Sequence, residues 1–353
     1  MAEKVLMKGN EAIAEAALRA GCRHYFGYPI TPQTELTAYM AKRLPKMGGV
    51  FLQAESEIAA INMVYGVAST GKRVMTSSSS PGISLKQEGI SYIAGADLPA
   101  LIINVQRGGP GLGGIQPSQS DYFQATKGGG HGDYHLIVLT PSSVQEMADL
   151  TALAFDLGDK YRMPAMILAD GTLGQTMEPV VLPEEHVNVV EKPWAVTGTK
   201  MAREHNVVNS LYLVPEILEK TNNDRFERYK YIEEHEVRYE SYMMDDADYC
   251  IVAFGIAARV SRNAVTALRK KGIRAGMIRP ITVWPFPKKV IREAADHVKA
   301  FVSVELSMGQ MIEDVKLAEE CIRPVYLCQR SGGIIPSPQE VTELVEKLEG
   351  GAE

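Results

Sequence analysis

The sequence predicts an α/β fold in which a parallel sheet is covered by helices, followed by a second and smaller α/β unit. Short runs rich in β-branched residues alternate with helical patterns up to residue 181, and the alternation resumes at Tyr249. Strands that alternate with helices pair as parallel neighbours, with helices on both faces. The chain of 353 residues is also longer than one core usually serves. We therefore expect two domains.

The first unit, residues 1–181, has clear signals at its helix starts. Asn10 is predicted as an N-cap, and Gly21 lies just past the end of the helix that follows. Thr31 and Pro32 fit the cap and the first position of the next helix, a start worth about 1 kcal/mol. Further helices are expected near Glu55, Ser84, Ser118 and Ser142, between strands at 24–26, 49–53, 73–76, 99–106, 135–139 and 163–169.

The middle of the chain, residues 182–248, is charged and irregular. Its run ERYKYIEEHEVRYE, at 227–240, is typical of a solvated helix face in a connecting segment. The second unit, residues 249–353, opens with the strand YCIVAFG and ends with a helix from Pro338. Between them we expect a helix at 257–271, strands at 274–278, 301–305 and 324–329, and the segment ITVWPFP at 281–287.

The composition limits the class of protein. The formal charge of −6 and the pI near 5.8 disfavour nucleic acid and anionic membranes as partners, because such polyanions bind basic faces. Apolar residues make up 45% without a long apolar run, so we expect a cytoplasmic protein without membrane contact. The 4 cysteines show no CxxC and no Cys/His grouping at zinc or iron-sulfur spacing. Any redox centre is therefore expected on another chain, and no metal on this one.

A glycine-rich stretch, GGPGLGG, suggests nucleotide binding at first inspection. Gly109, Gly111 and Gly114 match GxGxxG after the apolar strand LIINVQR, and Asp133 follows about twenty residues later. The third glycine should open a helix, but Ile-Gln-Pro follows it, and the strand is not the first of its series. We interpret the stretch as a flexible or close-approach loop, with nucleotide binding as the alternative.

Serines and histidines offer two further candidate sites. TSSSSPG, at 76–82, has no GxSxG surroundings and no assignable base, so it predicts a polar helix start or an oxygen-binding turn. His131 and His135 lie in GGGHGDYH, which has too much glycine for a helix that would aim both at one metal. His131 is instead a candidate for a substrate-facing loop.

Two charged residues stand where ligands bind in open α/β sheets. Glu57 shares a helical face with Ala60 and Val64, and a buried carboxylate is costly unless it is paired or functional. Glu55 is the alternative acid. The non-functional alternative for both residues is a solvated carboxylate in the first turn of a helix. Arg107 ends an apolar strand, so its guanidinium should lie at the carboxyl edge, where it suits a carboxylate ligand or a surface ion pair.

Taken together, several segments resemble the α subunit of the 2-oxoacid:ferredoxin oxidoreductases. They follow its order and spacing over essentially the whole chain: GYPITPQTE, AESEIAA, TSSSSPGISLKQEGISYIAGADLPA, NVQRGGPGLGGIQPSQSDYFQATKGGGHGDYH, ITVWPFP and SVELSMGQ. The serine and glycine stretches are most similar to the branched-chain, 2-oxoisovalerate type. Many relatives carry TSGPG, and Ser80 stands here where their first glycine would be.

The resemblance implies one subunit of a thiamine diphosphate enzyme. Its fold would be a pyrimidine-binding domain followed by a transketolase C-terminal-like domain. In this family the β chain binds the diphosphate and Mg²⁺ through a GDG motif, whereas this sequence has only the near-match Ala169-Asp170-Gly171. The implied reaction converts 3-methyl-2-oxobutanoate and CoA to isobutyryl-CoA. Electrons would pass through [4Fe-4S] clusters on partner chains, the γ and ferredoxin-like δ subunits, to ferredoxin.

The resemblance also implies roles for residues. Glu57, with Glu55 as the fallback, matches the acid that hydrogen-bonds the thiamine aminopyrimidine and favours its imino form. Arg107 matches the arginine that holds the 2-oxoacid carboxylate, and Thr31 matches the threonine that meets substrate oxygen. The remaining assignments are to the cofactor for Pro29 and Ile30, and to the substrate for Ser80 and His131.

Alternatives stay open within and outside this class. 2-Oxoglutarate would need a further positive group for its second carboxylate, which Lys86 in ISLKQEG could supply, and pyruvate is the other rival substrate. Outside the class, the chain could be a nucleotide-binding redox subunit or a non-catalytic scaffold for a partner enzyme.

Overall fold

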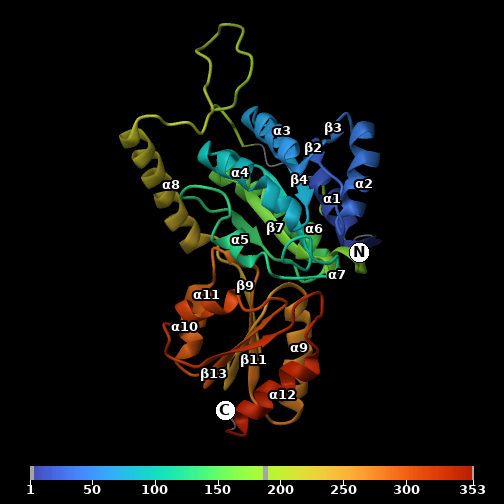
Figure 1. Cartoon of the computed structure of the whole chain (residues 1–353), viewed down its shortest axis with the longest axis vertical. Coiled ribbons are helices and arrows are strands. Elements are labelled where there is room, and N and C mark those ends of the chain that lie inside the picture. The colour runs from blue at the N-terminus through green and yellow to red at the C-terminus, as the bar shows by residue number, and fades with distance from the viewer. Residues whose placement is uncertain (1–3, 186–189, 352–353) are drawn as a thin grey trace.

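The computed structural model describes residues 4–185 and 190–351, which form two α/β bodies stacked end to end (Figure 1). The sheet of the first body consists of β2 (His24–Gly27), β3 (Val50–Gln53), β4 (Val74–Ser78), β5 (Leu101–Gln106), β6 (Ile137–Leu139), β7 (Ala165–Asp170) and β12 (Thr282–Trp284). These 7 strands lie in the order β12-β6-β7-β5-β4-β2-β3. All neighbours pair in parallel except β12, which is antiparallel to β6. The predicted parallel sheet is confirmed.

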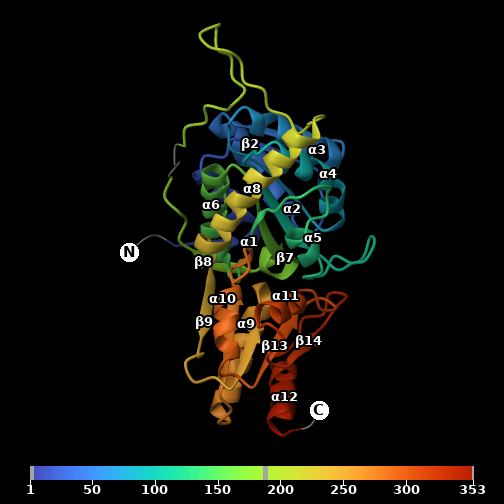
Figure 2. The same cartoon turned by 90° about the vertical axis from the view of Figure 1, so that its left-hand side faces the viewer.

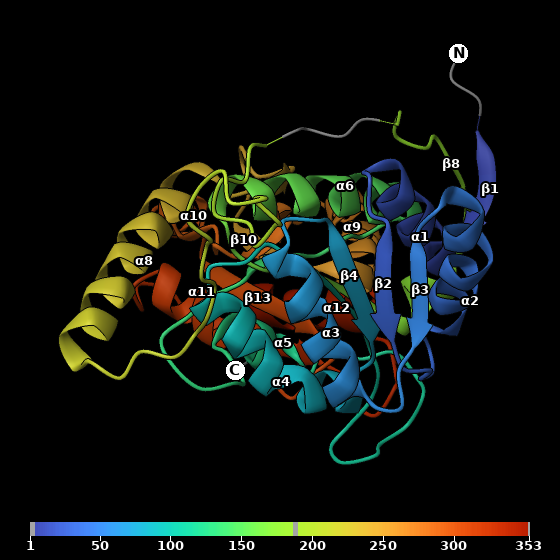
Figure 3. The same ribbon diagram turned by 90° about the horizontal axis from the view of Figure 1, so that it is seen from above.

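Helices cover both faces of this sheet (Figure 3). α1 (Gly9–Arg19) and α6 (Val144–Tyr161) pack together on one face, and α3 (Glu57–Ser69) and α4 (Pro81–Gly95) pack together on the other. An antiparallel ribbon that the sequence did not predict pairs β1 (Val5–Lys8) with β8 (Met177–Val180). The remaining helices of this body are α2 (Thr34–Arg43), the 3₁₀ helix η1 (Leu44–Met47), α5 (Tyr122–Thr126) and α7 (Gly171–Gln175).

The second body has a smaller sheet of β9 (Tyr239–Tyr242), β10 (Tyr249–Val252), β11 (Ala275–Pro280), β13 (Ala300–Glu305) and β14 (Val325–Gln329). Its order is β14-β13-β10-β11-β9. Its helices are α9 (Gly255–Lys270), α10 (Lys288–Ala295), α11 (Met311–Ala318) and α12 (Pro338–Glu349). Helix α8 (Pro215–His235) runs along the first body with a largely solvated outer face, as the charged run predicts (Figure 2). Within the described ranges, no helix has the length and apolar character of a membrane span.

Two strands pair with a sheet that lies outside the predicted sequence unit to which they belong. β12 belongs to ITVWPFP, which lies within residues 249–353, yet it extends the first sheet beside β6. β9 lies in the predicted connecting segment, yet it pairs with β11 of the second sheet. One apolar cluster also runs through both bodies, because Phe254 and Phe301 pack in the same core as Tyr25. The two bodies therefore share backbone pairing and core.

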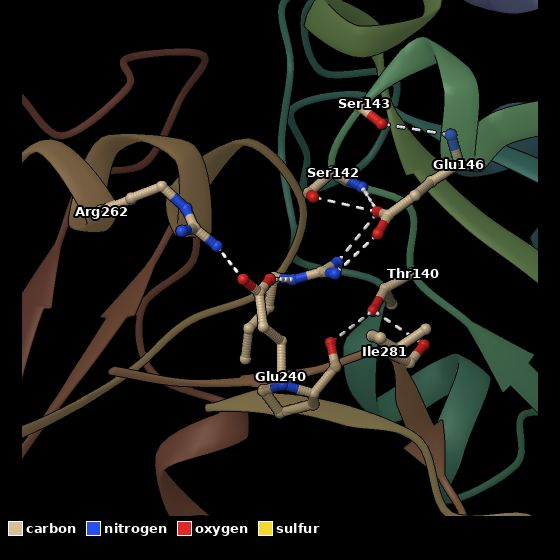
Figure 4. Close-up of polar contacts among 9 residues, drawn as sticks. Thr140, Ser142, Ser143, Glu146, Glu240, Arg262 and Ile281 are labelled. Carbon is tan, nitrogen blue, oxygen red and sulfur yellow. Dashed lines mark hydrogen bonds and ion pairs between the residues drawn. The ribbon is translucent and has the colours of Figure 1, made fainter. Parts of the chain in front are cut away.

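Charged side chains fix this junction (Figure 4). Arg279 of β11 is 4% exposed and donates to both carboxylate oxygens of Glu146 of α6, at 2.9 and 2.6 Å. It also donates to Glu240 of β9 at 2.9 Å, and Arg262 of α9 pairs with that same carboxylate. A guanidinium fork that meets a carboxylate through two bonds fixes orientation as well as distance. The network therefore defines how the two bodies face each other.

The predicted cap at Asn10 is wrong, although the helix is present. α1 begins at Gly9, and the Asn10 side chain turns inward to donate to Pro32 O at 2.8 Å and to Glu35 Oε2 at 3.0 Å. Its amide is thus used for a tertiary contact rather than for capping. Gly21 does follow the end of this helix, with a φ of 82° that favours glycine.

The predicted cap at Thr31 is also wrong. α2 begins at Thr34, and Thr31 lies in an exposed turn before it. The Gln33 side chain explains why the helix begins later, because its Oε1 accepts hydrogen bonds from Thr37 at 2.8 Å and from Ser77 of β4 at 2.6 Å. These contacts hold the turn against the sheet, and they override the local preference for a helix start at Pro32.

Candidate functional site

The carboxyl edge of the first sheet gathers the polar segments that the sequence singled out. β2 leads into residues 28–33, β3 into Glu55 and Glu57, β4 into Ser79 and Ser80, and β5 into Arg107. From β2 the chain moves outward to β3 and then returns to the other side of β2 to form β4. Open α/β sheets bind ligands at such a switch point, beyond the carboxyl ends of the strands.

Glu57 is a buried carboxylate in the first turn of α3. Ser56 caps this helix by accepting a hydrogen bond from Ala59 N at 3.1 Å, which holds the first turn in place. Glu57 is 6% exposed on the apolar helix face, as predicted, whereas Glu55 is exposed. Within the described ranges the Glu57 carboxylate has no hydrogen-bond donor and no ion-pair partner. Burial without such a partner is costly and fits a group reserved for a ligand.

Small and hydroxylic residues surround Glu57. A Cβ at Gly82 would lie 2.7 Å from Glu57 Oε1 and 2.1 Å from Ser78 Oγ, so glycine makes room for both groups. The hydroxyls of Ser78 and Ser79 are buried without a hydrogen-bond partner in the described part of the chain. Buried hydroxyls normally have partners, so the carboxylate and the Ser78 hydroxyl beside it are polar groups left for a ligand such as an aminopyrimidine. The serine stretch itself leads directly into α4, which confirms the predicted polar helix start.

Arg107 borders the same edge. It follows β5, as predicted, and is 7% exposed. Its Nη1 donates to Thr31 O at 3.1 Å and its Nη2 donates to Leu112 O at 3.0 Å. Its buried Nε has no partner among the described residues. Arg107 is therefore bonded to backbone oxygens rather than paired with a surface acid, and its remaining N–H donors are available to a carboxylate ligand.

The opening stretch after β2 lies at this edge as well. Pro29 and Thr31 are exposed and Ile30 is half-buried, so all three present atoms to the surface. Arg107 touches this stretch through the Thr31 carbonyl, which leaves the Thr31 hydroxyl outside that bond. The structure thus brings together four of the predicted residues, Arg107, Pro29, Ile30 and Thr31.

Ser80 ties the start of α4 to the end of β5. Its hydroxyl donates to Asp121 Oδ2 at 2.6 Å and accepts from Arg107 N at 3.0 Å. Asn104 closes the ring, because its Nδ2 donates to the same Asp121 oxygen at 2.8 Å and its Oδ1 accepts from Ser80 N at 3.2 Å. A hydroxyl has one proton to donate, and here Asp121 receives it. The structure therefore gives Ser80 a part in positioning Arg107, and the predicted contact of Ser80 with substrate stays a prediction.

Arg107 and Ser80 line a cleft of about 430 Å³ between the two bodies. The first body supplies one wall with the glycine loop that follows Arg107. The second body supplies the other wall with Leu306, Met308 and the loop at 331–332. The cleft thus lies at the domain junction, next to the carboxyl edge of the first sheet.

The glycine loop folds back on itself. Gly111 and Gly113 have φ values of 67° and 59°, and Gly114 N donates to Gly108 O at 2.8 Å. Arg107 then forms an isolated bridge with Pro117, and the next helix is α5. Because no helix starts at the third glycine, a dinucleotide would find no helix N-terminus here. The close-approach loop predicted for GGPGLGG is confirmed.

Comparisons with known proteins identify the family. Residues 15–241 match the thiamine diphosphate-binding domain of the pyruvate flavodoxin/ferredoxin oxidoreductases, and residues 247–341 match core domain II of pyruvate:ferredoxin oxidoreductase. The chain belongs to the 2-oxoacid:ferredoxin oxidoreductase family. The ketoisovalerate oxidoreductase subunit VorB of Methanothermobacter thermautotrophicus is 52% identical over 346 residues, which cover 98% of each chain. The 2-oxoglutarate synthase subunit KorA of Methanothermobacter marburgensis is 37% identical and covers 97% of this chain and 98% of its own.

Solved structures agree with this membership of the oxidoreductase family. A 2-oxoglutarate:ferredoxin oxidoreductase from Magnetococcus marinus, with 2-oxoglutarate, coenzyme A and succinyl-CoA bound, has a TM-score of 0.88 and 28% identity. The match covers 98% of this chain and 65% of that one. A split-gene transketolase has a TM-score of 0.58 at 14% identity, which shows the fold alone. The predicted fold, a thiamine-type α/β domain followed by a transketolase-like domain, is confirmed.

His131 lies away from the Arg107 cleft of this oxidoreductase subunit. It lines another cleft, of about 530 Å³, with Gly95 at the end of α4 and Arg225 of α8. α4 has 15 residues, so its two ends are roughly 20 Å apart at about 1.5 Å per residue. The structure does not bring His131 to Arg107, and we leave it out of the proposed site. His135 stacks on Trp284 with ring centroids 4.7 Å apart.

Two buried carboxylates were not recognised as structural groups from the sequence. Asp121 stands in the quoted segment QPSQSDY, but nothing in its local pattern shows that it meets Ser80 and Asn104. Burial raises the pKa of its carboxyl group.

Asp170, in the near-match to GDG, caps α7 through Oδ1, and its Oδ2 accepts from Ile256 N at 3.3 Å. Burial raises the pKa of Asp170 to about 6. The near-match is thus explained by helix capping.

Proposed function

We propose that this chain is the α-type subunit of an enzyme that converts ketoisovalerate, 3-methyl-2-oxobutanoate, and CoA to isobutyryl-CoA and CO₂ with ferredoxin as electron acceptor. Two similarities of nearly equal length support the substrate: 52% identity to a ketoisovalerate oxidoreductase subunit against 37% to a 2-oxoglutarate synthase subunit. The observation that carries the site is the placement of a buried acceptor, Glu57, and a buried donor, Arg107, at one sheet edge.

Glu57 would serve the thiamine cofactor. Thiamine diphosphate, when bound, supplies the nucleophilic carbon that attacks a 2-oxo group. The Glu57 carboxylate would share the proton of a ring nitrogen in the aminopyrimidine, next to the unpaired hydroxyl of Ser78. We assign the diphosphate and Mg²⁺ to a β subunit that carries GDG, because Asp170 is already used to cap α7.

Arg107 would hold the substrate carboxylate until CO₂ leaves. A guanidinium has five N–H donors, and backbone oxygens take one each from Nη1 and Nη2. Thr31 is exposed next to it, since Arg107 donates to the Thr31 carbonyl, and the Thr31 hydroxyl would meet a substrate oxygen. On the opposite wall, beside the polar residues Ser307, Gln310 and Ser331, Met308 is 71% exposed and offers an apolar contact for methyl groups. Lys86, the cation that favoured 2-oxoglutarate, is 0% exposed and does not line this cleft.

The electron path would leave this chain. Its 4 cysteines are spread along the sequence, which favours [4Fe-4S] clusters on γ and ferredoxin-like δ subunits. Expression with the genomic neighbours should therefore co-purify a β chain with GDG and a small ferredoxin-like chain. This complex should reduce ferredoxin or viologen when it receives 3-methyl-2-oxobutanoate, CoA and thiamine diphosphate.

Steady-state kcat/KM over a panel of 2-oxoacids tests the substrate. We expect 3-methyl-2-oxobutanoate to exceed both pyruvate and 2-oxoglutarate. A higher kcat/KM with 2-oxoglutarate would overturn the branched-chain assignment. Absence of thiamine- and CoA-dependent reduction with every acid in the panel would overturn the function itself.

Arg107→Ala tests the residue assigned to the carboxylate. Loss of hydrogen bonds to a charged group costs about 1.5–3 kcal/mol, so kcat/KM for the 2-oxoacid should fall roughly 10- to 150-fold. Arg274→Ala is the matched control, because Arg274 is 57% exposed and its ion pair among the described residues is with Asp248, in the second body. A wild-type apparent affinity in the Arg107→Ala complex would remove Arg107 from this role.

A further inference from the structure

Lys86 is a buried cation without an acid bonded to it. It lies in the middle of α4, is 0% exposed, and donates from Nζ to Thr76 Oγ1 of β4 at 2.8 Å. No ion pair of Lys86 occurs within residues 4–185 and 190–351. An isolated buried ammonium is expensive, and here burial lowers the pKa of Lys86 to about 7. Such a group is a candidate for function when it lies near a site.

The packing of α4 on α3 places Lys86 behind Glu57. Gly82, Lys86 and Gly89 fall on one face of α4, four and three residues apart. A Cβ at Gly82 would meet Glu57 Oε1, and a Cβ at Gly89 would lie 2.4 Å from Ile61 Cγ2. The two glycines thus bring α4 close to the Glu57–Ile61 row of α3, and the Lys86 side chain reaches from the same face of α4 to Thr76 of β4.

The distance between the two charges follows from β4. Thr76 holds the ammonium of Lys86, and Ser78 lies beside the Glu57 carboxylate. Thr76 and Ser78 point to the same face of the strand and are two residues apart, which corresponds to roughly 7 Å. The intervening space is buried, since Thr76 and Ser78 are both 0% exposed. The attraction between Lys86 and Glu57 is therefore weakly screened.

We propose that Lys86 is a positioning residue, a buried counter-charge to the Glu57 carboxylate that strengthens binding of the thiamine aminopyrimidine. This inference rests on the role proposed for Glu57. Within the described part of the chain, burial lowers the pKa of Lys86, and the Glu57 carboxylate of α3 acts in the opposite direction. The neighbours from β4, Thr76 and Ser78, do not titrate in the relevant range.

The test measures thiamine diphosphate affinity against pH by titration calorimetry of the assembled complex. Lys86→Met removes the charge and packs as a flexible apolar chain, and Lys86→Gln removes the charge but keeps a donor for Thr76. At about 7 Å and an effective dielectric of about 20, loss of this attraction should weaken thiamine diphosphate binding roughly 10- to 50-fold near pH 6 in both variants. Lys289→Met, at a site 91% exposed, is the control and should leave the profile unchanged.

A second comparison separates this inference from the proposed function. In a Glu57→Gln background, Lys86→Gln should leave the affinity unchanged, because the carboxylate on which it acts is gone. If Glu57→Gln weakens binding but folded Lys86→Met and Lys86→Gln complexes both keep the wild-type profile, the inference is wrong and the role of Glu57 stands. If Glu57→Gln binds thiamine diphosphate and turns over like wild type, the proposed role of Glu57 fails.

Discussion

Ser80→Ala should destabilise the chain and displace Arg107. The Ser80 hydroxyl gives a 2.6 Å hydrogen bond to the buried Asp121 carboxylate and takes one of 3.0 Å from Arg107 N. Loss of a hydrogen bond to a charged group costs about 1.5–3 kcal/mol, and a buried N–H left without an acceptor costs about 1–3 kcal/mol. We therefore expect the free energy of unfolding to fall by about 3–5 kcal/mol.

Ser80→Gly should be the milder change. It loses the same two hydrogen bonds, but glycine relieves the positive φ of 21° at this position. Relief of backbone strain of this kind is worth about 1 kcal/mol. Ser84→Ala, on the same helix and exposed to the same cleft, is the control and should change stability by less than about 0.5 kcal/mol.

Denaturant unfolding of the full-length chain measures the stabilities, and KM for the 2-oxoacid in the assembled complex measures the position of Arg107. We expect KM to rise more than kcat falls in Ser80→Ala, because the arginine that holds the carboxylate is less well fixed. A Ser80→Ala chain as stable as the Ser84→Ala control would refute the hydrogen-bond ring as a stabilising unit.

Two further predictions concern stability. Burial raises the pKa of Asp170 to about 6, so the stability it contributes is complete below about pH 4 and is lost as the pH rises to about 6. Asp170→Asn, which keeps the cap on α7, should flatten that fall of up to about 3 kcal/mol in denaturant titrations against pH. Arg279→Met should cost about 1.5–3 kcal/mol, because it removes a buried guanidinium that bonds two half-buried carboxylates, those of Glu146 and Glu240. Arg274→Met should cost under about 1 kcal/mol, because its ion pair is exposed. Equal losses would refute the junction network.

Sequence patterns predicted the features that depend on local burial. A helix whose apolar positions recur on one face shows which face is inside, so Glu57 could be placed in the buried row of α3. An apolar strand followed by Arg107 put the guanidinium at the carboxyl edge, because parallel strands end together there. Both predictions needed only the direction of one element.

Contacts between elements that are far apart in the sequence could not be predicted from patterns within one element. β12 reads as an element of the second unit, yet it pairs with β6, and no periodicity within a strand says which neighbour it takes. The ring of Ser80, Asn104 and Asp121 likewise joins three elements. His131 was predicted on a substrate-facing loop, but it lines a different cleft from Arg107, together with Gly95 at the end of α4.

The stretch GYPITPQTE shows why a wrong local prediction can leave the functional one intact. Its turn is held from outside, since Asn10 donates to Pro32 O, Gln33 is bonded to β4, and Arg107 donates to Thr31 O. These contacts fix the backbone without using the Thr31 side chain. A cap would have engaged the threonine oxygen with a backbone N–H. Without that bond, both the proton and the lone pairs of an exposed hydroxyl stay available at a rigid position beside Arg107, which is what contact with a substrate oxygen requires.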